Sequence, residues 1–111
     1  MANEFYARNG VRAFTFGTGA SLTINGNVLT FQTLSVSANS SFSLSNIKIG
    51  VMYEFLVKNT GGSSITITIP NTSDVRVSDT VTITASKARE FSLTYDGTKR
   101  YWQVSEELLG A

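Results

Sequence analysis

Apolar side chains recur at every second position through most of this 111-residue chain, in short segments bounded by Ser, Asn, Asp or Gly. A period of two is that of a β-strand with one buried face, because successive side chains of a strand point to opposite sides. No long helix is expected, and residues 106–109 could form at most one helical turn. We therefore predict an all-β protein of about eight to ten short strands. Five of them are expected at Val11–Phe16, Leu34–Ser37, Phe42–Ile47, Val75–Val77 and Val81–Thr84.

Two glycine-containing turns predict β-hairpins in the first two-thirds of the chain. Asn25-Gly26 is typical of a two-residue type I′ turn, and Thr60-Gly61-Gly62 of a three-residue loop with glycine at positive φ. Both hairpins would bring large apolar side chains onto one face of a sheet. The first would set Leu22 opposite Leu29 and Ala20 opposite Phe31, and the second would set Val57 opposite Ile65 and Phe55 opposite Ile67.

A third hairpin is predicted around the loop Asp96–Lys99. This four-residue loop would set Leu93 opposite Trp102 and Phe91 opposite Val104. A three-residue loop would instead set Phe91 against the polar Gln103, so the four-residue loop is favoured. Because Tyr101 and Trp102 are neighbours on one strand, Trp102 then faces the core and Tyr101 is the exposed aromatic.

The composition favours a single domain built from two packed sheets. Ser and Thr number 14 each, whereas Glu plus Lys number only 9, a balance typical of strands and turns. We predict an antiparallel sandwich or jelly roll over residues 1–111, with 1–10 as an N-terminal arm and 106–111 as a C-terminal tail. Charged residues are 15% of the chain, against about a quarter in ordinary domains, so strand edges have few charged guards. We therefore expect a homo-oligomer, a trimer somewhat before other states.

Several classes of function are disfavoured by what the chain lacks. With no Cys and no His there is no disulfide, thiolate nucleophile, Cys/His zinc site or imidazole base. The net charge of +1 gives no global attraction to nucleic acid or to a membrane surface, and no apolar run is long enough to span a bilayer or serve as a signal peptide. Carboxylate pairs such as Asp74 with Asp79 or Glu90 with Asp96 are the remaining acid/base candidates, and no motif marks them. We expect no enzyme activity, no catalytic residues, no cofactor and no metal.

Seven residues are the candidates for contact with a partner. Lys87, Arg89, Lys99 and Arg100 are expected to cluster near one hairpin, with the exposed Tyr101 beside them. A basic patch with a single exposed aromatic suits an acidic protein surface better than single-stranded nucleic acid, which needs several exposed aromatics. Phe5 and Tyr6 lie before the first convincing strand, so we expect the arm to bury them against a neighbouring subunit.

Four runs of residues carry a resemblance to a known kind of protein. The segments Gly50-Val-Met-Tyr-Glu-Phe-Leu-Val-Lys-Asn-Thr-Gly-Gly, Ile65-Thr-Ile-Thr-Ile-Pro and Phe91-Ser-Leu-Thr-Tyr-Asp-Gly, with Tyr101-Trp-Gln-Val, are similar to small β modules of tailed-bacteriophage virion proteins. Such modules occur in capsid decoration or auxiliary proteins, head fibres and tail appendages. The resemblance, over about residues 34–105, implies a structural role in the virion through contacts with other virion proteins. The alternative is a receptor- or carbohydrate-binding module of a tail appendage, in which Tyr101 would stack on a cell-surface glycan.

Overall fold

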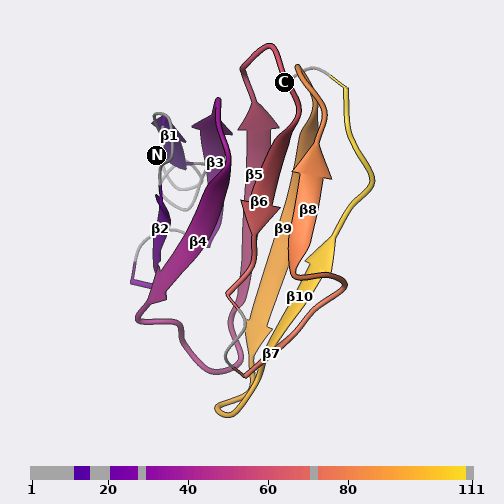
Figure 1. Cartoon of the computed structure of the whole chain (residues 1–111). Helices are drawn as coiled ribbons and strands as arrows, with labels where there is room; N and C mark the ends of the chain where they lie inside the picture. Colours follow the sequence, from indigo (N-terminus) through magenta and orange to yellow (C-terminus); the bar gives the residue numbers. More distant parts are fainter. Residues whose placement is uncertain (1–11, 16–20, 28–29, 71–72, 110–111) are drawn as a thin grey trace.

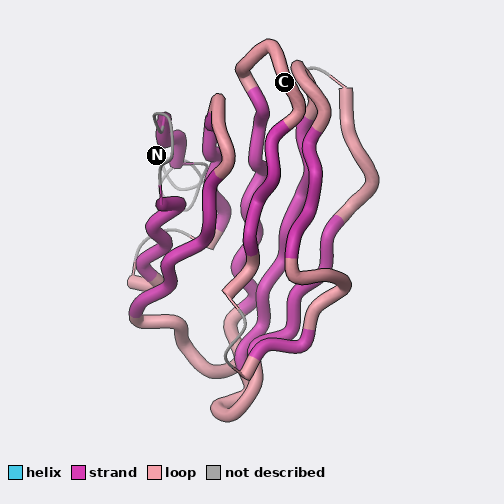
Figure 2. The backbone as a smooth tube through the Cα atoms, in the orientation of Figure 1, coloured by secondary structure: helices cyan, strands magenta, loops and turns pink. Residues whose placement is uncertain are grey.

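The computed structural model describes residues 12–15, 21–27, 30–70 and 73–109. Within them the chain forms strands joined by loops, without a helix, as Figure 2 shows. The strands are β1 (Arg12–Thr15), β2 (Ser21–Asn25), β3 (Phe31–Val36), β4 (Ser40–Ser45), β5 (Met52–Asn59), β6 (Ile65–Thr68), β7 (Asp74–Val75), β8 (Thr80–Ile83), β9 (Ala88–Tyr95) and β10 (Arg100–Val104). The prediction of an all-β chain with about eight to ten short strands is confirmed for this part of the protein.

The strands form two layers, which lie one over the other in Figure 1. The six-stranded sheet has the order β1-β3-β5-β9-β10-β7, and the four-stranded sheet has the order β2-β4-β6-β8. Each connection from β1 as far as β9 therefore carries the chain from one sheet to the other, and β9 and β10 are consecutive neighbours within one sheet. Two packed sheets were expected, but this alternation between them was not.

Strands β1 to β6 follow the path of a β-solenoid. β1, β3 and β5 are parallel in one sheet, and β2, β4 and β6 are parallel in the other, so the chain coils around a shared core. Position 12 lies beside position 32, and position 21 beside position 41. The predicted antiparallel sandwich or jelly roll is wrong for this part of the chain. Alternating apolar residues suggested antiparallel strands because parallel sheets are usually covered on both sides, whereas each sheet here keeps one uncovered outer face.

The two predicted hairpins at Asn25-Gly26 and Thr60-Gly61-Gly62 are also wrong. β2 and β3 belong to different sheets, and so do β5 and β6, while Ala20 and Leu29 lie outside the described residues. Each turn is a corner of the coil. The reason for the error is physical: two consecutive strands bury alternate residues equally well whether they pair side by side or face each other across the core. Val57 and Ile65 are both buried, but in opposite sheets.

The third hairpin is confirmed in its register. β9 and β10 are antiparallel, with Leu93 opposite Trp102 and Phe91 opposite Val104. The amide of Asp96 donates to the carbonyl of Lys99 across the four-residue loop, over 3.1 Å. Trp102 is buried and Tyr101 is 41% exposed, as the opposite faces of one strand require.

Aromatic side chains join the two parts of the fold. The ring of Phe42, on β4, lies 5.0 Å from the ring of Trp102 and 5.3 Å from that of Phe91. Phe55, on β5, is 5.5 Å from Phe42. One core therefore holds the coil of β1–β6 against the antiparallel strands that follow it.

Candidate interaction surface

The outer face of the six-stranded sheet carries three exposed apolar side chains, Met52, Tyr101 and Val75, in a row that the half-buried Thr94 completes. Met52 lies beside Thr94, Thr94 beside Tyr101, and Tyr101 beside Val75, across four neighbouring strands. Met52 is 56% exposed and Val75 is 45% exposed. We call Met52, Thr94, Tyr101 and Val75 the apolar row. Two more exposed apolar residues lie close to the row in the chain: Ile49 precedes Met52, and Val77 follows Val75.

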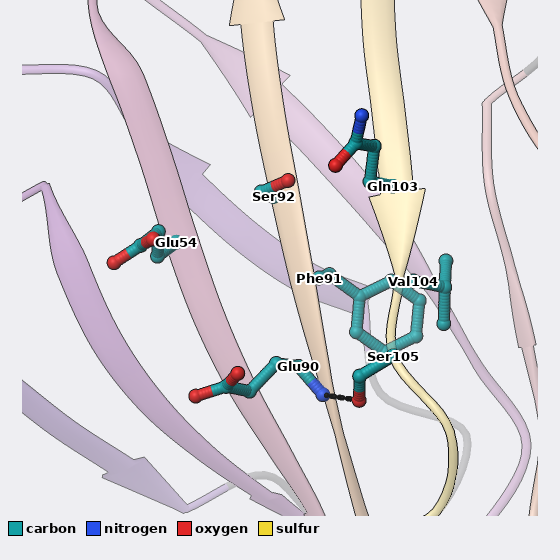
Figure 3. Close-up of a pocket in the computed structure, with 7 residues that line it drawn as sticks. All are labelled: Glu54, Glu90, Phe91, Ser92, Gln103, Val104 and Ser105. Atoms are coloured by element: carbon teal, nitrogen blue, oxygen red, sulfur yellow. Dashed lines mark hydrogen bonds between the residues drawn. The ribbon is translucent and has the colours of Figure 1, made fainter.

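Next to the apolar row, the same face is hollowed into a pocket of about 230 Å³, which is lined by polar side chains and by Phe91 and Val104. Figure 3 shows Glu54 on β5, Glu90 and Ser92 on β9, and Gln103 and Ser105 on the β10 side. The amide of Glu90 donates to the hydroxyl of Ser105 over 2.9 Å. The pocket offers hydrogen-bond acceptors and negative charge at the border of an apolar surface, an arrangement that suits the polar rim of a protein contact.

The carboxylates that share this pocket were not the pairs predicted from the sequence. Glu90 and Asp96 lie towards opposite ends of β9, whereas Glu54 and Glu90 both line the pocket. Their proximity depends on the pairing of β5 with β9, between positions 30 to 42 residues apart, which no local motif records. Asp74 and Asp79 are each bonded to an arginine, Arg100 and Arg76 respectively.

Tyr101, the predicted exposed aromatic, is held by the loop of its own hairpin. Its hydroxyl donates to the Asp96 carboxylate over 3.0 Å. Asp96 also accepts the amides of Lys99 and Thr98, and these hydrogen bonds, with that of Tyr101, lower the pKa of the Asp96 carboxyl. The same carboxylate raises the pKa of Tyr101, since it holds the phenolic proton. The ring is therefore presented in one orientation at the centre of the apolar row.

The four basic residues do not form the single cluster predicted from the sequence. Lys87 and Arg89 lie at the start of β9, while Lys99 and Arg100 lie at the start of β10, beside the end of β9. At roughly 3.3 Å per residue, the length of β9 puts about 23 Å between the two pairs. The two pairs are close in sequence, but the length of β9 separates them in space. The prediction of a single basic patch near one hairpin is therefore wrong.

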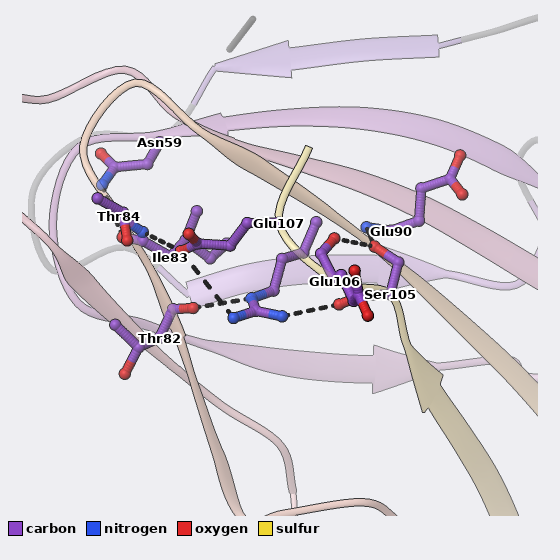
Figure 4. Close-up of polar contacts among 9 residues, drawn as sticks. Asn59, Thr82, Ile83, Thr84, Glu90, Ser105, Glu106 and Glu107 are labelled. Carbon is purple, nitrogen blue, oxygen red and sulfur yellow. Dashed lines mark hydrogen bonds and ion pairs between the residues drawn. The ribbon is translucent and has the colours of Figure 1, made fainter. Parts of the chain in front are cut away.

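Arg89 makes its contacts within the protein. Arg89 and Glu107 together close the edge of the four-stranded sheet, and we call this pair the strap. The Nε of Arg89 donates to the carbonyl of Thr82 on the edge strand β8 over 2.8 Å, and its Nη1 donates to the carbonyl of Ser105 over 2.8 Å. Its Nη2 is 3.9 Å from Glu107 Oε2. The Glu107 carboxylate in turn accepts the amide of Thr84 over 2.6 Å (Figure 4).

This strap covers backbone groups at the β8 edge that another chain could otherwise bind. The amide and carbonyl of Leu108 both pair with those of Ala88, so the segment predicted as a tail adds to the six-stranded sheet. The hydrogen bond from Thr84, followed by the charges of Arg89 and Lys87, lowers the pKa of Glu107. No sequence motif marks Glu107, because its partners Thr84 and Arg89 lie in an earlier part of the chain.

Arg100 is also committed within the protein. Its Nε donates to Asp74 Oδ1 over 2.6 Å, and the Asp74 side chain is fully buried. Replacing Arg89 or Arg100 by Glu would therefore damage the fold itself, so charge reversal there cannot report on a partner. Phe5 and Tyr6, the remaining predicted contact residues, lie outside the described residues.

Two further classes of site were sought in the described part of the chain. No group of three or more acidic, His or Cys side chains there could hold a metal ion. Nor do those residues include a helix with the length and apolar character needed to cross a membrane. Comparison of the chain with protein-family models, curated proteins and solved structures finds no match.

Proposed function

We propose that this chain is a non-enzymatic structural component of a bacteriophage virion, of the capsid decoration, auxiliary or head-fibre kind, that acts by protein–protein contacts. The resemblance of residues 34–105 to virion β modules supports this proposal, and the apolar row is the single observation that carries it. Contiguous exposed apolar side chains bordered by polar ones mark interaction surfaces on soluble domains.

A difference between the two outer faces of the protein supports the six-stranded sheet as the contact surface. The outward positions of the four-stranded sheet hold only Ser, Thr and Asn among the described side chains: Thr23, Asn25, Ser41, Ser43, Ser45, Thr66, Thr68, Thr80 and Thr82. Such a face is well hydrated and offers little apolar area to bury. The outer face of the six-stranded sheet offers Met52, Tyr101 and Val75 together, with Glu54 and Glu90 at their border. We therefore place the contact on the six-stranded sheet.

The proposed occupant of this face is a second copy of the chain, within a closed oligomer whose expected state is a trimer. A closed ring covers the apolar row on every copy and keeps growth finite. The net charge of +1 gives little electrostatic repulsion between two copies of the chain, so charge does not oppose self-association.

Sedimentation of the purified protein tests this proposal. The wild type should sediment as an oligomer, and Met52→Lys should shift it towards monomer, because a lysine on the apolar row would be buried in each contact. Thr68→Lys, the matched change on the outer face of the four-stranded sheet, should leave the oligomer intact. A wild type that stays monomeric at high concentration, or equal dissociation by the two variants, would remove the support for this surface.

A further inference from the structure

A second pocket, separate from the proposed contact face, lies between the two sheets at one end of the molecule. Its walls come from the end of β4 and the turn after it, from the residue before β7, and from the β9–β10 loop. Its volume is about 320 Å³, compared with about 230 Å³ for the pocket on the outer face. Small-molecule sites begin at roughly 300 Å³, so this pocket has room for a ligand of one ring.

The chemistry of the lining is that of hydroxyls, an amide and an aromatic ring. Ser73 and Thr98 supply hydroxyl groups, and Asn46 supplies a side-chain amide whose Nδ2 donates to Asn25. Tyr95 supplies an aromatic ring, and Leu44 and Ile47 contribute an apolar part. A pyranose ring needs this combination, since it presents hydroxyls around its rim and C–H groups on its faces.

The lining is also held in place. The hydroxyl of Tyr95 donates to the carbonyl of Gly97 over 2.9 Å, which fixes the tyrosine within its loop. Asn46 and Ser73 have φ of 55° and 58°, the left-handed region that non-glycine residues seldom adopt and that recurs at ligand sites. Preorganised walls lower the entropic cost of binding a small ligand.

Charge decides which sugars fit. The one guanidinium in the lining, Arg100, is neutralised by the fully buried carboxylate of Asp74 at 2.6 Å. An anionic sugar would find no net positive charge there to replace its lost hydration. We propose that this pocket binds a neutral hexopyranose, alone or as the terminal residue of a glycan, and that Tyr95 rather than Tyr101 provides the stacking ring.

Amide chemical shifts of the full chain, followed by NMR during sugar titration, test this site. The probes are methyl α-D-glucopyranoside, methyl β-D-galactopyranoside and N-acetylglucosamine at millimolar concentration, with N-acetylneuraminic acid as the charged comparison. At least one neutral sugar should shift the amides of Ser45, Asn46, Ser73 and Thr98, and the charged sugar should not. Absence of such shifts with every neutral sugar, or shifts with the charged sugar alone, would overturn the proposal.

Two variants and one control separate this pocket from the exposed aromatic. Tyr95→Ala should weaken binding by about tenfold, the factor that corresponds to 1.4 kcal/mol. Thr98→Trp, at an exposed loop position, should block the pocket without touching the core, and serves where Tyr95→Ala does not fold. Tyr101→Ala should leave sugar binding unchanged. Loss of binding in Tyr101→Ala with retention in Thr98→Trp would assign the sugar to the outer face and refute the pocket.

Discussion

The coil of β1–β6 and the closing strands β8–β10 bury the same core in different ways. In the coil, each strand is followed by one in the opposite sheet, and neighbours within a sheet are parallel. In the closing part, β8 pairs antiparallel with β6, and β9 pairs antiparallel with both β5 and β10. The coil therefore depends on corners that turn the chain across the core, whereas the closing part depends on a local hairpin and on sealed edges.

Polar groups at the corners are satisfied by uncharged buried side chains. Asn59 is fully buried, accepts the amide of Gly61 and donates to the carbonyls of Ser63 and Ile83. Tyr53, also fully buried, donates its hydroxyl to the carbonyl of Gly26 and accepts the amide of Lys48. At Gly26 a Cβ atom would lie 2.0 Å from the Asn46 carbonyl oxygen, so this close approach of two corners requires glycine.

The closing part uses charged side chains instead. Arg89 and Glu107 bond the β8 edge, and Arg100 binds Asp74 of β7. Arg89, Glu107 and Arg100 remain partly exposed, so water still solvates their charges in part, and the buried Asp74 carboxylate is compensated by Arg100. The comparison teaches that the chain places neutral hydrogen bonds inside the coil and ion pairs where the sheets end.

The largest effect is expected where the two parts meet, at Trp102. Trp102→Ala should destabilise the protein by roughly 3–5 kcal/mol, because the indole packs on Phe42 of the coil and leaves a cavity when truncated. Trp102→Phe should cost less, since the buried indole nitrogen has no hydrogen-bond partner among the described residues. Equilibrium urea unfolding measures both changes. Tyr101→Ala is the control, and a loss comparable to that of Trp102→Ala would show that Tyr101 is not on the outer face.

Asn59 is the next most sensitive position, and it tests a corner of the coil together with its bond to β8. Asn59→Ala should cost about 2–3 kcal/mol, because the Ile83 carbonyl and the Gly61 amide lose their partner inside the protein. Asn27→Ala, at the exposed turn after β2, should change the free energy of unfolding by less than about 0.5 kcal/mol. Equal losses in the two variants would mean that the corner at Asn59 is no more constrained than a surface turn.

Much of this architecture could be predicted from the sequence, and the remainder could not for a definite reason. Strand positions, the burial of Trp102 and the register of β9 with β10 follow from alternation and one local turn. The corners at Asn25 and Asn59 look like hairpin turns because the Asn side chain accepts the amide two residues later in each. Whether such a turn leads to the neighbouring strand or to the opposite sheet depends on contacts with the previous coil, such as the bond from the Thr60 amide to the Val36 carbonyl.

The interaction residues show the same division between local and distant information. Tyr101 was predicted as exposed because its position depends on the residue next to it. The roles of Arg89 and Glu107 depend on the β8 edge, and the apolar row depends on four strands from separate parts of the chain. Alternation alone does not record which strands are neighbours, so these groupings were out of reach.

A smaller effect is expected at Tyr53, where only a hydroxyl is removed. Tyr53→Phe should cost about 1 kcal/mol, within the range for one buried hydrogen-bonding group, since the carbonyl of Gly26 and the amide of Lys48 lose a partner. Tyr101→Phe is the matched control because its hydroxyl contacts an exposed carboxylate. Urea unfolding of both variants gives the comparison. If Tyr101→Phe proves the more harmful change, the corners do not depend on the buried hydroxyl.

The smallest effect is expected in the pH dependence of stability. Glu107 in the strap titrates, whereas the uncharged Asn59 at a corner of the coil does not. The pKa of Glu107 is lowered from 4.5, chiefly by the hydrogen bond from Thr84 and then by Arg89 and Lys87. The folded state thus favours the ionised Glu107 carboxylate. The stability that this carboxylate contributes is complete above its pKa in the unfolded state, and it is lost as the pH falls through its lower pKa in the folded state. Glu107→Gln keeps an acceptor for the Thr84 amide but removes this dependence. The free energy of unfolding should fall less steeply from pH 6 to pH 3 in Glu107→Gln than in the wild type, as urea titrations at each pH would measure.

Two controls isolate the strap in that experiment. Glu106→Gln removes a neighbouring exposed carboxylate and should keep the pH dependence of the wild type. The Asp96 carboxylate, whose pKa is also lowered, is present in all three proteins and cancels from the comparison. Hydrogen exchange of the Thr84 amide gives a second measurement, because Glu107 accepts that amide. In the wild type, the protection of this amide, measured against the exchange rate of a free amide at the same pH, should fall as the pH falls. In Glu107→Gln it should change less. A wild type and a Glu107→Gln variant with the same pH profile would show that the ionised Glu107 carboxylate adds nothing to the closure of the β8 edge by Arg89.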